Sequence, residues 1–368
     1  MRWLWGIPAA LAGAYYLVAL AAGLARMRRP KRRPAFTPPV SILKPVRGRD
    51  PRFQEAIRSH AIQRYPDFEI LFGVADPADP AVADVQRLQR EFPDRAIRLV
   101  VCPTRAANGK VGVLADLAVE ARHPYLLVND SDILVEPDYL TTVMAPLQDS
   151  EAGLVTCLYR ASGDSLPSRF EGLGIATEFA PSVLVARFAG VSGFALGSTM
   201  AFRVSDLQRI GGFSALADYL ADDYELGARI SALGYCVELS DAVVETNLSG
   251  ATWGEVWRHQ LRWSRTIRAS RTAGYYGYLV TQASAWAVVA AFAGQWWAVA
   301  CAMAPRLATG LLVGWGVLRD RNVVSRWYLM PVRDLWGFAV WVAGLAGSSV
   351  EWRGIKLRLG SDGKIVPF

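Results

Sequence analysis

The sequence predicts an α/β domain with membrane helices on both sides of it. Short apolar runs alternate with amphipathic stretches between residues 38 and 250, as strands and helices do in βαβ units. Apolar segments with few charges lie before and after this region, and a helix of roughly 20 such residues can cross a bilayer. A chain of 368 residues, 52% of them hydrophobic, is long enough for both parts.

Residues 3–25 are apolar and uncharged, which predicts a transmembrane helix within 1–27. The basic run 26–34 follows this segment, whereas a cleaved signal peptide has its positive charges before the apolar core. The positive-inside rule therefore places the first residues outside and residue 26 onward in the cytoplasm. A buried core helix is the alternative interpretation of the same segment.

The apolar character returns after residue 277 and predicts a C-terminal membrane region over 276–350. Three segments are candidates for crossings: 278–304, the short segment 307–318, and 335–350. The tail 351–368 is basic, which favours the cytoplasmic side, whereas three crossings from a cytoplasmic domain place it outside. The side of the tail stays open.

The middle region, 28–250, is predicted to be a cytoplasmic α/β domain. Its first four apolar runs are typical of a covered parallel sheet, and two later runs add strands. The predicted strands are 40–46, 69–75, 97–102, 125–130, 153–159 and 198–204. Helical spacing without breakers predicts helices at 51–64, 80–92 and 110–121.

Polar residues follow three of these strands, and ligands bind at the carboxyl ends of strands in such sheets. Asp130 and Asp132 are two positions apart after a strand, a pattern that suits Mg²⁺ or Mn²⁺ and equally suits an Asx-turn with a helix cap. Asp76 ends another strand, where it either binds a ligand or begins a turn before proline. Lys110 lies at a helix start, which favours phosphate.

Asp222 and Asp223 precede an amphipathic helix. One acid complements the helix dipole, and the second is then available as a general base. A basic amphipathic helix follows within 251–275, and its arginines suit either lipid headgroups or a diphosphate. Arg262 and Trp263 are the candidates for the second role.

The stretch 166–197 is apolar but contains charged residues, so it is predicted to be an in-plane helix and loop that present a lipid, or else a core helix on the sheet. The four cysteines include no CxxC pair, which argues against a disulfide scaffold and a zinc site. Because the basic run directly follows an apolar segment, we expect a membrane and no nucleic acid as its partner.

The order of these residues resembles the processive-type family 2 and the family 21 glycosyltransferases. Those families carry the signature D, D, D, (Q/R)xxRW on a GT-A fold, matched here in order by Asp76, Asp130-Ser131-Asp132, Asp223 and Arg262-Trp263. The motifs "SILKPVRG", "NGKVG" and "LADDYELG" look like the ceramide glucosyltransferase family and its bacterial relatives that glycosylate hopanoids. The resemblance covers nearly the whole chain, about residues 1–360, and implies a GT-A nucleotide-diphospho-sugar transferase domain.

The resemblance also implies roles for individual residues. Asp223 would be the catalytic base, and Asp130 and Asp132 would hold a divalent cation, Mg²⁺ or Mn²⁺. The UDP-sugar would be bound by six residues, Asp76, Lys110, Asp130, Asp222, Arg262 and Trp263. One position departs from the signature: His259 stands where the family has Gln or Arg, and Gln260 is one position out of register.

By this resemblance the chain would be an inverting, multi-pass membrane enzyme with its catalytic domain in the cytoplasm, as at a bacterial inner membrane. Its partners would be a UDP-sugar donor, a membrane lipid acceptor and the bilayer. Transfer of glucose from UDP-glucose to ceramide is the first expectation. The alternatives are N-acetylglucosaminyl transfer to a hopanoid, a processive polysaccharide synthase, and a receptor that only binds a nucleotide-sugar.

Overall fold

The structure is a computed structural model that describes residues 2–30, 36–352 and 354–366. The chain forms two compact units. The sheet unit comprises residues 31–159 and 192–247, and the helical unit comprises residues 1–30, 160–191 and 248–368. Residues 31–34 of the predicted basic run and residues 353, 367 and 368 of the basic tail lie outside the described residues.

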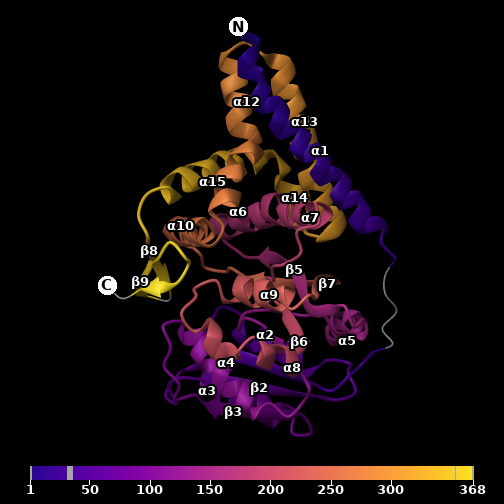
Figure 1. The fold of residues 1–368 in the computed structure, drawn as a ribbon, viewed down its shortest axis with the longest axis vertical. Helices are drawn as coiled ribbons and strands as arrows, with labels where there is room; N and C mark the ends of the chain where they lie inside the picture. The colour runs from indigo at the N-terminus through magenta and orange to yellow at the C-terminus, as the bar shows by residue number, and fades with distance from the viewer. Residues whose placement is uncertain (1, 31–35, 353, 367–368) are drawn as a thin grey trace. The chain divides into compact units, whose positions relative to one another are not determined.

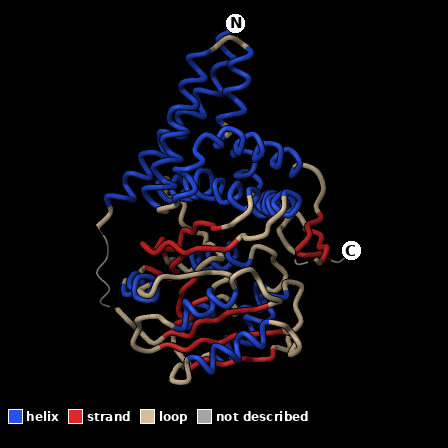
Figure 2. Tube along the Cα trace, turned by 180° about the vertical axis from the view of Figure 1, so that it is seen from behind, coloured by secondary structure: helices blue, strands red, loops and turns tan. Residues whose placement is uncertain are grey.

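The sheet unit is built on a seven-stranded mixed sheet (Figures 1 and 2). Its strands, in spatial order, are β3 (Ala96–Val101), β2 (Phe68–Val74), β1 (Val40–Val46), β4 (Tyr125–Val128), β6 (Met200–Arg203), β5 (Ala152–Ser162) and β7 (Cys236–Asn247). β1 pairs in parallel with β2 and β4, and β2 with β3, whereas β6 is antiparallel to β4 and β5. The four predicted parallel strands are therefore confirmed.

Strand β1 is buried on both faces, as its mainly apolar sequence predicts, although Ser41 and Lys44 lie within it. Ile42 belongs to the core on one face of the sheet and its neighbour Leu43 to the core on the other, because successive side chains of a strand point to opposite faces. The helices of this unit are α2 (Phe53–Ala61), α3 (Ala81–Glu91), α4 (Gly109–Glu120), α5 (Tyr139–Met144), α8 (Val204–Arg209) and α9 (Asp222–Ala232), with short 3₁₀ turns at Ala145–Gln148 and Phe213–Leu216.

The strand order reverses at β1. From β1 the chain continues to β2 and β3 on one side and then returns to place β4 on the other side. In open α/β sheets, ligands bind beyond the carboxyl ends of the strands at such a switch point. The carboxyl ends of β1 and β4 are thus the place where this topology favours a site.

The helical unit contains a bundle of three apolar helices, α1 (Ile7–Arg28), α12 (Ala283–Phe292) and α13 (Trp296–Leu311), drawn indigo and orange in Figure 1. Its core is almost entirely alanine, with Tyr16 the main exception. The backbones lie so close that a Cβ on Gly13 would be 2.1 Å from the Cys301 carbonyl oxygen. Small residues that allow such close approach are typical of helix pairs in membranes.

Two helical stretches of the described residues are long and apolar enough to cross a membrane, Trp3–Arg28 and Trp296–Val317. The first confirms a spanning-length helix at the predicted place. The predicted segment 278–304 is corrected, because it is broken into α12 and α13 by a turn at Gly294, whose φ is +74°. Glycine adopts this backbone conformation without strain, so the apolar run folds back as a hairpin.

The second arm of this hairpin continues through the predicted short segment 307–318 as a π-helical stretch, Leu312–Val317. The predicted third crossing, 335–350, overlaps α15 (Met330–Gly344), which has 15 residues and is followed by strand β8 (Ser349–Trp352). Fifteen residues rise only about 23 Å, short of the ~30 Å of a hydrocarbon core. Three C-terminal crossings are therefore not confirmed.

The other helices of this unit run across the bundle axis in Figure 1. They are α6 (Leu166–Gly174), α7 (Ala180–Phe188), α10 (Trp253–Ser270), α11 (Thr272–Gly277), α14 (Arg321–Arg326) and α15; short 3₁₀ or π turns lie at Arg2–Gly6, Ile175–Phe179, Tyr278–Thr281 and Trp327–Leu329. A small sheet follows, of β8, β9 (Ile355–Leu359) and β10 (Ile365–Val366). Most of the predicted stretch 166–197, residues 166–191, belongs to the helical unit.

Candidate active site

The Asp130–Asp132 loop follows β4 directly and therefore lies at the switch point of the sheet. Neither acid caps a helix, because the next helix, α5, begins after Asp138. The Thr246 hydroxyl donates a hydrogen bond to the Asp132 carboxylate, and the Ser131 hydroxyl donates to Asp50 at 2.6 Å. Of the two predicted explanations for this acid pair, the helix cap is excluded.

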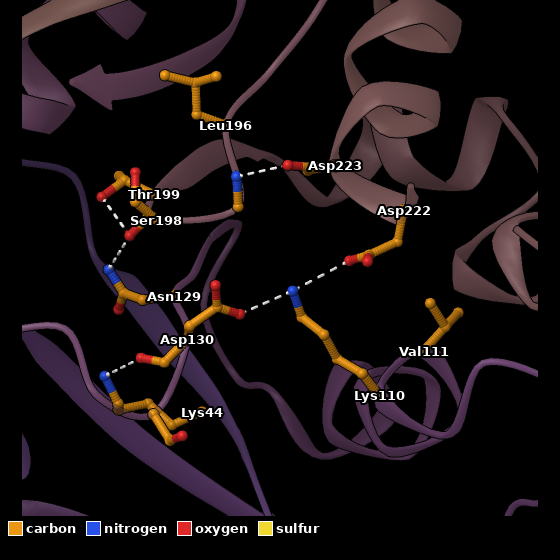
Figure 3. A network of polar contacts seen from close by, with 12 residues as sticks. Lys44, Lys110, Val111, Asn129, Asp130, Leu196, Ser198, Thr199, Asp222 and Asp223 are labelled. Carbon is orange, nitrogen blue, oxygen red and sulfur yellow. Dashed lines mark hydrogen bonds and ion pairs between the residues drawn. The ribbon is translucent and has the colours of Figure 1, made fainter. Parts of the chain in front are cut away.

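Lys110 lies in the first turn of α4 and reaches the acids of this loop (Figure 3). The helix starts here because the Asn108 side chain accepts hydrogen bonds from the backbone N–H groups of Lys110 and Val111. The Lys110 ammonium is 2.9 Å from an Asp130 oxygen and 3.2 Å from an Asp222 oxygen. One cation thus joins acids from two distant segments of the chain.

Asp222 and Asp223 are the first two residues of α9. Asp222 forms an ion pair with Lys110. Asp223 accepts two backbone hydrogen bonds, from the Gly197 N–H to one carboxylate oxygen and from the Tyr224 N–H to the other, each at 2.8 Å. These bonds fix the carboxylate plane of Asp223 and leave further lone pairs for a proton donor. The two acids thus have different partners, and the catalytic role of Asp223 stays a prediction.

Gly197 lies next to both Asp223 and Asp130. A Cβ at this position would be 3.3 Å from an Asp223 oxygen and 3.5 Å from an Asp130 oxygen. A glycine here therefore keeps the space between them free of a side chain while its N–H donates a hydrogen bond to Asp223. Two acids separated by such a space can act on one bound molecule.

The charges of the cluster shift the pKa values of its members. Burial, together with the neighbouring Asp222, raises the pKa of Asp223 from 3.8 to about 6, against the opposing effects of Lys110 and the two N–H donors. Burial and Asp130 likewise raise the pKa of Asp132. Burial alone would lower the pKa of Lys110, but Asp130 and Asp222 raise it well above its usual value. Perturbed carboxyl groups gathered in one place are typical of functional sites.

The donor set of Asp130 and Asp132 fits a hard divalent cation that takes its other ligands from a phosphate and water. The pKa of Asp132 is raised first by burial and then by the neighbouring Asp130 and Asp50 carboxylates, so a cation bound there would offset this negative charge. Among the described residues, no group of three or more His, Cys, Asp or Glu side chains forms a complete cage for a metal ion.

Asp76 also follows a strand of this edge, β2, and its side chain is exposed. Its carboxylate accepts a hydrogen bond from the Ala78 N–H at 2.8 Å, as in an Asx-turn. The structure thus brings Lys110, Asp130, Asp222 and Asp223 together, whereas Asp76 is bonded to its own turn.

The predicted Arg262 and Trp263 lie on α10 of the helical unit, and α10 begins with a capping box of Thr252 and Glu255. His259, at the departing signature position, has its Nδ1 2.6 Å from the buried Glu171 carboxylate, and its ring contacts Trp263 at a centroid distance of 4.5 Å. Gln260 instead accepts a hydrogen bond from Trp336. His259, not Gln260, is therefore the residue beside the signature tryptophan.

Several residues of the site were not predicted from the sequence. Gly197 lies in an apolar stretch without a motif, and Asp50 and Thr246 are more than 80 residues from the loop that they contact. The sequence places Lys44 in a strand and gives it no role in the site, yet its ammonium donates a hydrogen bond to the Asp130 carbonyl at 3.1 Å (Figure 3). A lysine inside a strand that is buried on both faces was the one available signal.

Comparison with known proteins finds glycosyltransferases among its relatives. A ceramide glucosyltransferase 1 of Caenorhabditis elegans is 25% identical over 229 residues, 61% of this chain and 49% of that protein. A probable glycosyltransferase, YdaM, of Bacillus subtilis is 26% identical over 238 residues, 62% of this chain and 55% of that protein. The chain thus spans about half the length of the curated relatives that it matches.

Among solved structures, a mannosyltransferase of Pyrobaculum calidifontis in complex with GDP-Man and Mn²⁺ is similar to this chain with a TM-score of 0.60. The match covers 94% of this chain and 99% of that one at 19% identity, and it confirms the predicted GT-A fold. The model of the family described as "Glycosyl transferase family 21" matches residues 5–365. Because this match spans nearly the whole chain, the protein belongs to glycosyl transferase family 21.

Proposed function

We propose that this chain is a membrane-bound, inverting glycosyltransferase that moves glucose from UDP-glucose to the primary hydroxyl of ceramide. The observation that carries the proposal is the cluster at the switch point of the sheet, where Lys110 joins Asp130 to Asp222 and Gly197 holds Asp223 beside them. Family membership and the ceramide glucosyltransferase relatives support the sugar and the lipid.

In this proposal Asp130 and Asp132 hold Mg²⁺ or Mn²⁺ together with the diphosphate of the donor. A cation bound there supplies electrostatic stabilisation of the charge that develops on UDP as it leaves. Lys110 lies beside the same acids and offers its ammonium to the phosphates. Asp76, at the end of β2, and Arg262 with Trp263, on α10, are the further proposed ligands of the UDP-sugar.

Asp223 acts as the base. The two N–H groups hold its carboxylate in one orientation, so that it accepts the proton of the acceptor hydroxyl as that oxygen attacks the anomeric carbon. The new glycosidic bond forms as the bond to UDP breaks, and the electron pair leaves on the β-phosphate. A single displacement inverts the anomeric centre, so an α-linked donor gives a β-glycoside.

The apolar helices of the helical unit support a membrane location, because two of them have spanning length. A lipid acceptor with its chains in the bilayer would present its hydroxyl at the headgroup level. We place the sheet unit on the cytoplasmic side, because Arg26 and Arg28 lie at the end of α1 that leads into the sheet unit and positive charges favour the cytoplasmic end of a membrane helix.

The test uses the full chain in native membranes or detergent with labelled UDP-glucose, ceramide and Mn²⁺. We expect a glucosylated ceramide in mass spectrometry and a β linkage in NMR spectra. Parallel reactions with UDP-N-acetylglucosamine and with a hopanoid or diacylglycerol identify the donor and the acceptor. A product with an α linkage would contradict Asp223 as the base of a single displacement.

Two variants complete this experiment. Asp223→Asn is expected to lose transfer by a factor of at least about 100, because general bases contribute roughly 10²–10⁴-fold, while UDP binding remains. Asp206→Asn is the matched control, since it removes another buried acid of the sheet unit, which pairs with Arg203 and Arg209. Full transfer by Asp223→Asn would remove the base from the proposal.

A further inference from the structure

A chain of buried polar side chains lies beneath the Asp130–Asp132 loop and is not used by the proposed chemistry. Lys44, His60 and Asn129 are completely buried, and Tyr139 is 2% exposed. They come from β1, α2, the end of β4 and α5. Burying a lysine without partners costs several kcal/mol, so each contact that it makes indicates its role.

The Lys44 ammonium contacts the backbone of the loop. Its Nζ donates to the Asp130 carbonyl oxygen at 3.1 Å (Figure 3). The same Nζ is 3.4 Å from the Nε2 atom of His60. The ammonium therefore holds the main chain of Asp130 and leaves both Asp130 carboxylate oxygens free of it.

Asn129 continues the chain toward the second half of the site. Its Oδ1 faces His60 at 3.1 Å, and its amide nitrogen donates to the Tyr139 hydroxyl at 2.8 Å and to the Ser198 carbonyl at 3.2 Å. The Tyr139 hydroxyl is in turn 2.9 Å from the Thr199 hydroxyl. The network thus ends in the segment next to Gly197, whose N–H holds Asp223.

We propose that Lys44 is a positioning residue for the Asp130–Asp132 loop and that Tyr139 links this loop to the segment that holds Asp223. The network then sets the separation of the two acids that flank Gly197. This inference rests on the proposed function, in which one acid pair binds a cation and the other acid is the base. Neither residue touches the substrate, so both act through the acids.

The experiment compares three variants of the full chain. Lys44→Met keeps an unbranched apolar side chain and removes the ammonium that bonds to Asp130, and Tyr139→Phe removes only the hydroxyl that joins Asn129 and Thr199. Ser41→Ala is the matched control: Ser41 is completely buried on the same strand, but its hydroxyl bonds to Glu69 and not to the loop. Thermal unfolding of all three gives the loss of stability.

The first readout needs no turnover. Binding of Mn²⁺ in the presence of UDP is titrated by electron paramagnetic resonance of the free ion. We expect Lys44→Met to weaken this binding by about 10–100-fold, the usual effect of removing an outer partner of metal ligands. Ser41→Ala is expected to leave it unchanged. Equal Mn²⁺ binding by Lys44→Met and wild type would overturn the assignment of Lys44, whether or not the wild type transfers glucose.

The second readout separates kcat from KM. Tyr139→Phe is expected to keep Mn²⁺ binding and the donor KM within about two-fold and to lower kcat by about ten-fold or more, because a small displacement of a catalytic group has such effects. A decrease in kcat no larger than that of Ser41→Ala would overturn the assignment of Tyr139. Absence of transfer by the wild type with every donor would instead refute the proposed function, and the Lys44 result would stand.

Discussion

The raised pKa of Asp223 predicts the pH dependence of the enzyme. A base with a pKa of about 6 is one-half deprotonated at pH 6 and about one-tenth deprotonated at pH 5. We therefore expect kcat/KM to rise about ten-fold per pH unit below pH 6 and to level off above pH 7. The same group must then affect the stability of the fold.

The sign of that effect follows from proton binding. Between pH 4 and 6 the folded protein keeps a proton on Asp223 that the unfolded chain has already lost, so stability decreases as pH rises through this window. The shift from 3.8 to about 6 is about 2.2 units, and at ~1.36 kcal/mol per unit the cost at pH 7 is about 3 kcal/mol. This cost is absent below pH 4.

Asp223→Asn removes this charge and with it the cost. One of the two N–H donors, Gly197 or Tyr224, then loses a charged acceptor, which costs about 1.5 kcal/mol. The net expectation at pH 7 is therefore a gain in stability of about 1–2 kcal/mol in a protein that has lost its activity. At pH 4 the gain disappears.

The assay combines two measurements: kcat/KM of the wild type from pH 4.5 to 8, and thermal unfolding of wild type and Asp223→Asn in detergent at pH 4, 5.5 and 7. Asp206→Asn again serves as the control, because its paired carboxylate lies outside the cluster. A rate that is flat between pH 5 and 7, or a variant that gains nothing at pH 7 relative to pH 4, would refute the reasoning.

Three further predictions follow from the geometry. Gly197→Ala places a methyl group near Asp223 and Asp130 and is expected to lower kcat/KM at least about ten-fold with little loss of stability. Gly109→Ala, whose added methyl group meets no neighbouring atom, is the control and should retain activity; equal kcat/KM for the two variants would show that the substrate does not use the space beside Gly197. Lys110→Met leaves Asp130 and Asp222 without their shared cation, so we expect about 3 kcal/mol lower stability by thermal unfolding. Mn²⁺ should raise the melting temperature of this variant more than that of the wild type, and a larger rise for the wild type would contradict the proposed role of Lys110. Gly13→Ala forces α1 away from α13 and should lower the melting temperature by several degrees, unlike Gly277→Ala, which has open space; unchanged melting would disprove the close packing.

The sequence was sufficient for the parallel part of the sheet, because β1, β2 and β4 are short, mainly apolar runs, and a polar residue follows each within two positions. The order of the acids also identified the residues that the structure gathers at Lys110. The predicted spans were less accurate. A hydropathy pattern averages over many residues and does not register one glycine, so the turn at Gly294 was not predicted.

The parts of the site that were missed depend on contacts between distant segments. Gly197 is important because of what surrounds it, and a glycine among apolar residues carries no chemical signal of its own. Lys44 was visible as a lysine inside a strand, but its partner is a backbone carbonyl, which every residue has. Sequence patterns indicate which side chains can perform chemistry, and they do not indicate which backbone groups hold them.

The alanine-lined bundle also bears on how the protein is made. The Thr309 hydroxyl bonds to the Tyr16 carbonyl oxygen across 293 positions of the chain, and both residues lie in this bundle. During synthesis α1 therefore emerges long before its partners α12 and α13, and all of the sheet unit is translated in between. Before α12 and α13 are made, α1 can pack against α7, through Val185. Assembly of the alanine-lined bundle is thus a late event in biogenesis, and a chain that ends after residue 247 would contain the whole sheet unit but lack two of the three bundle helices.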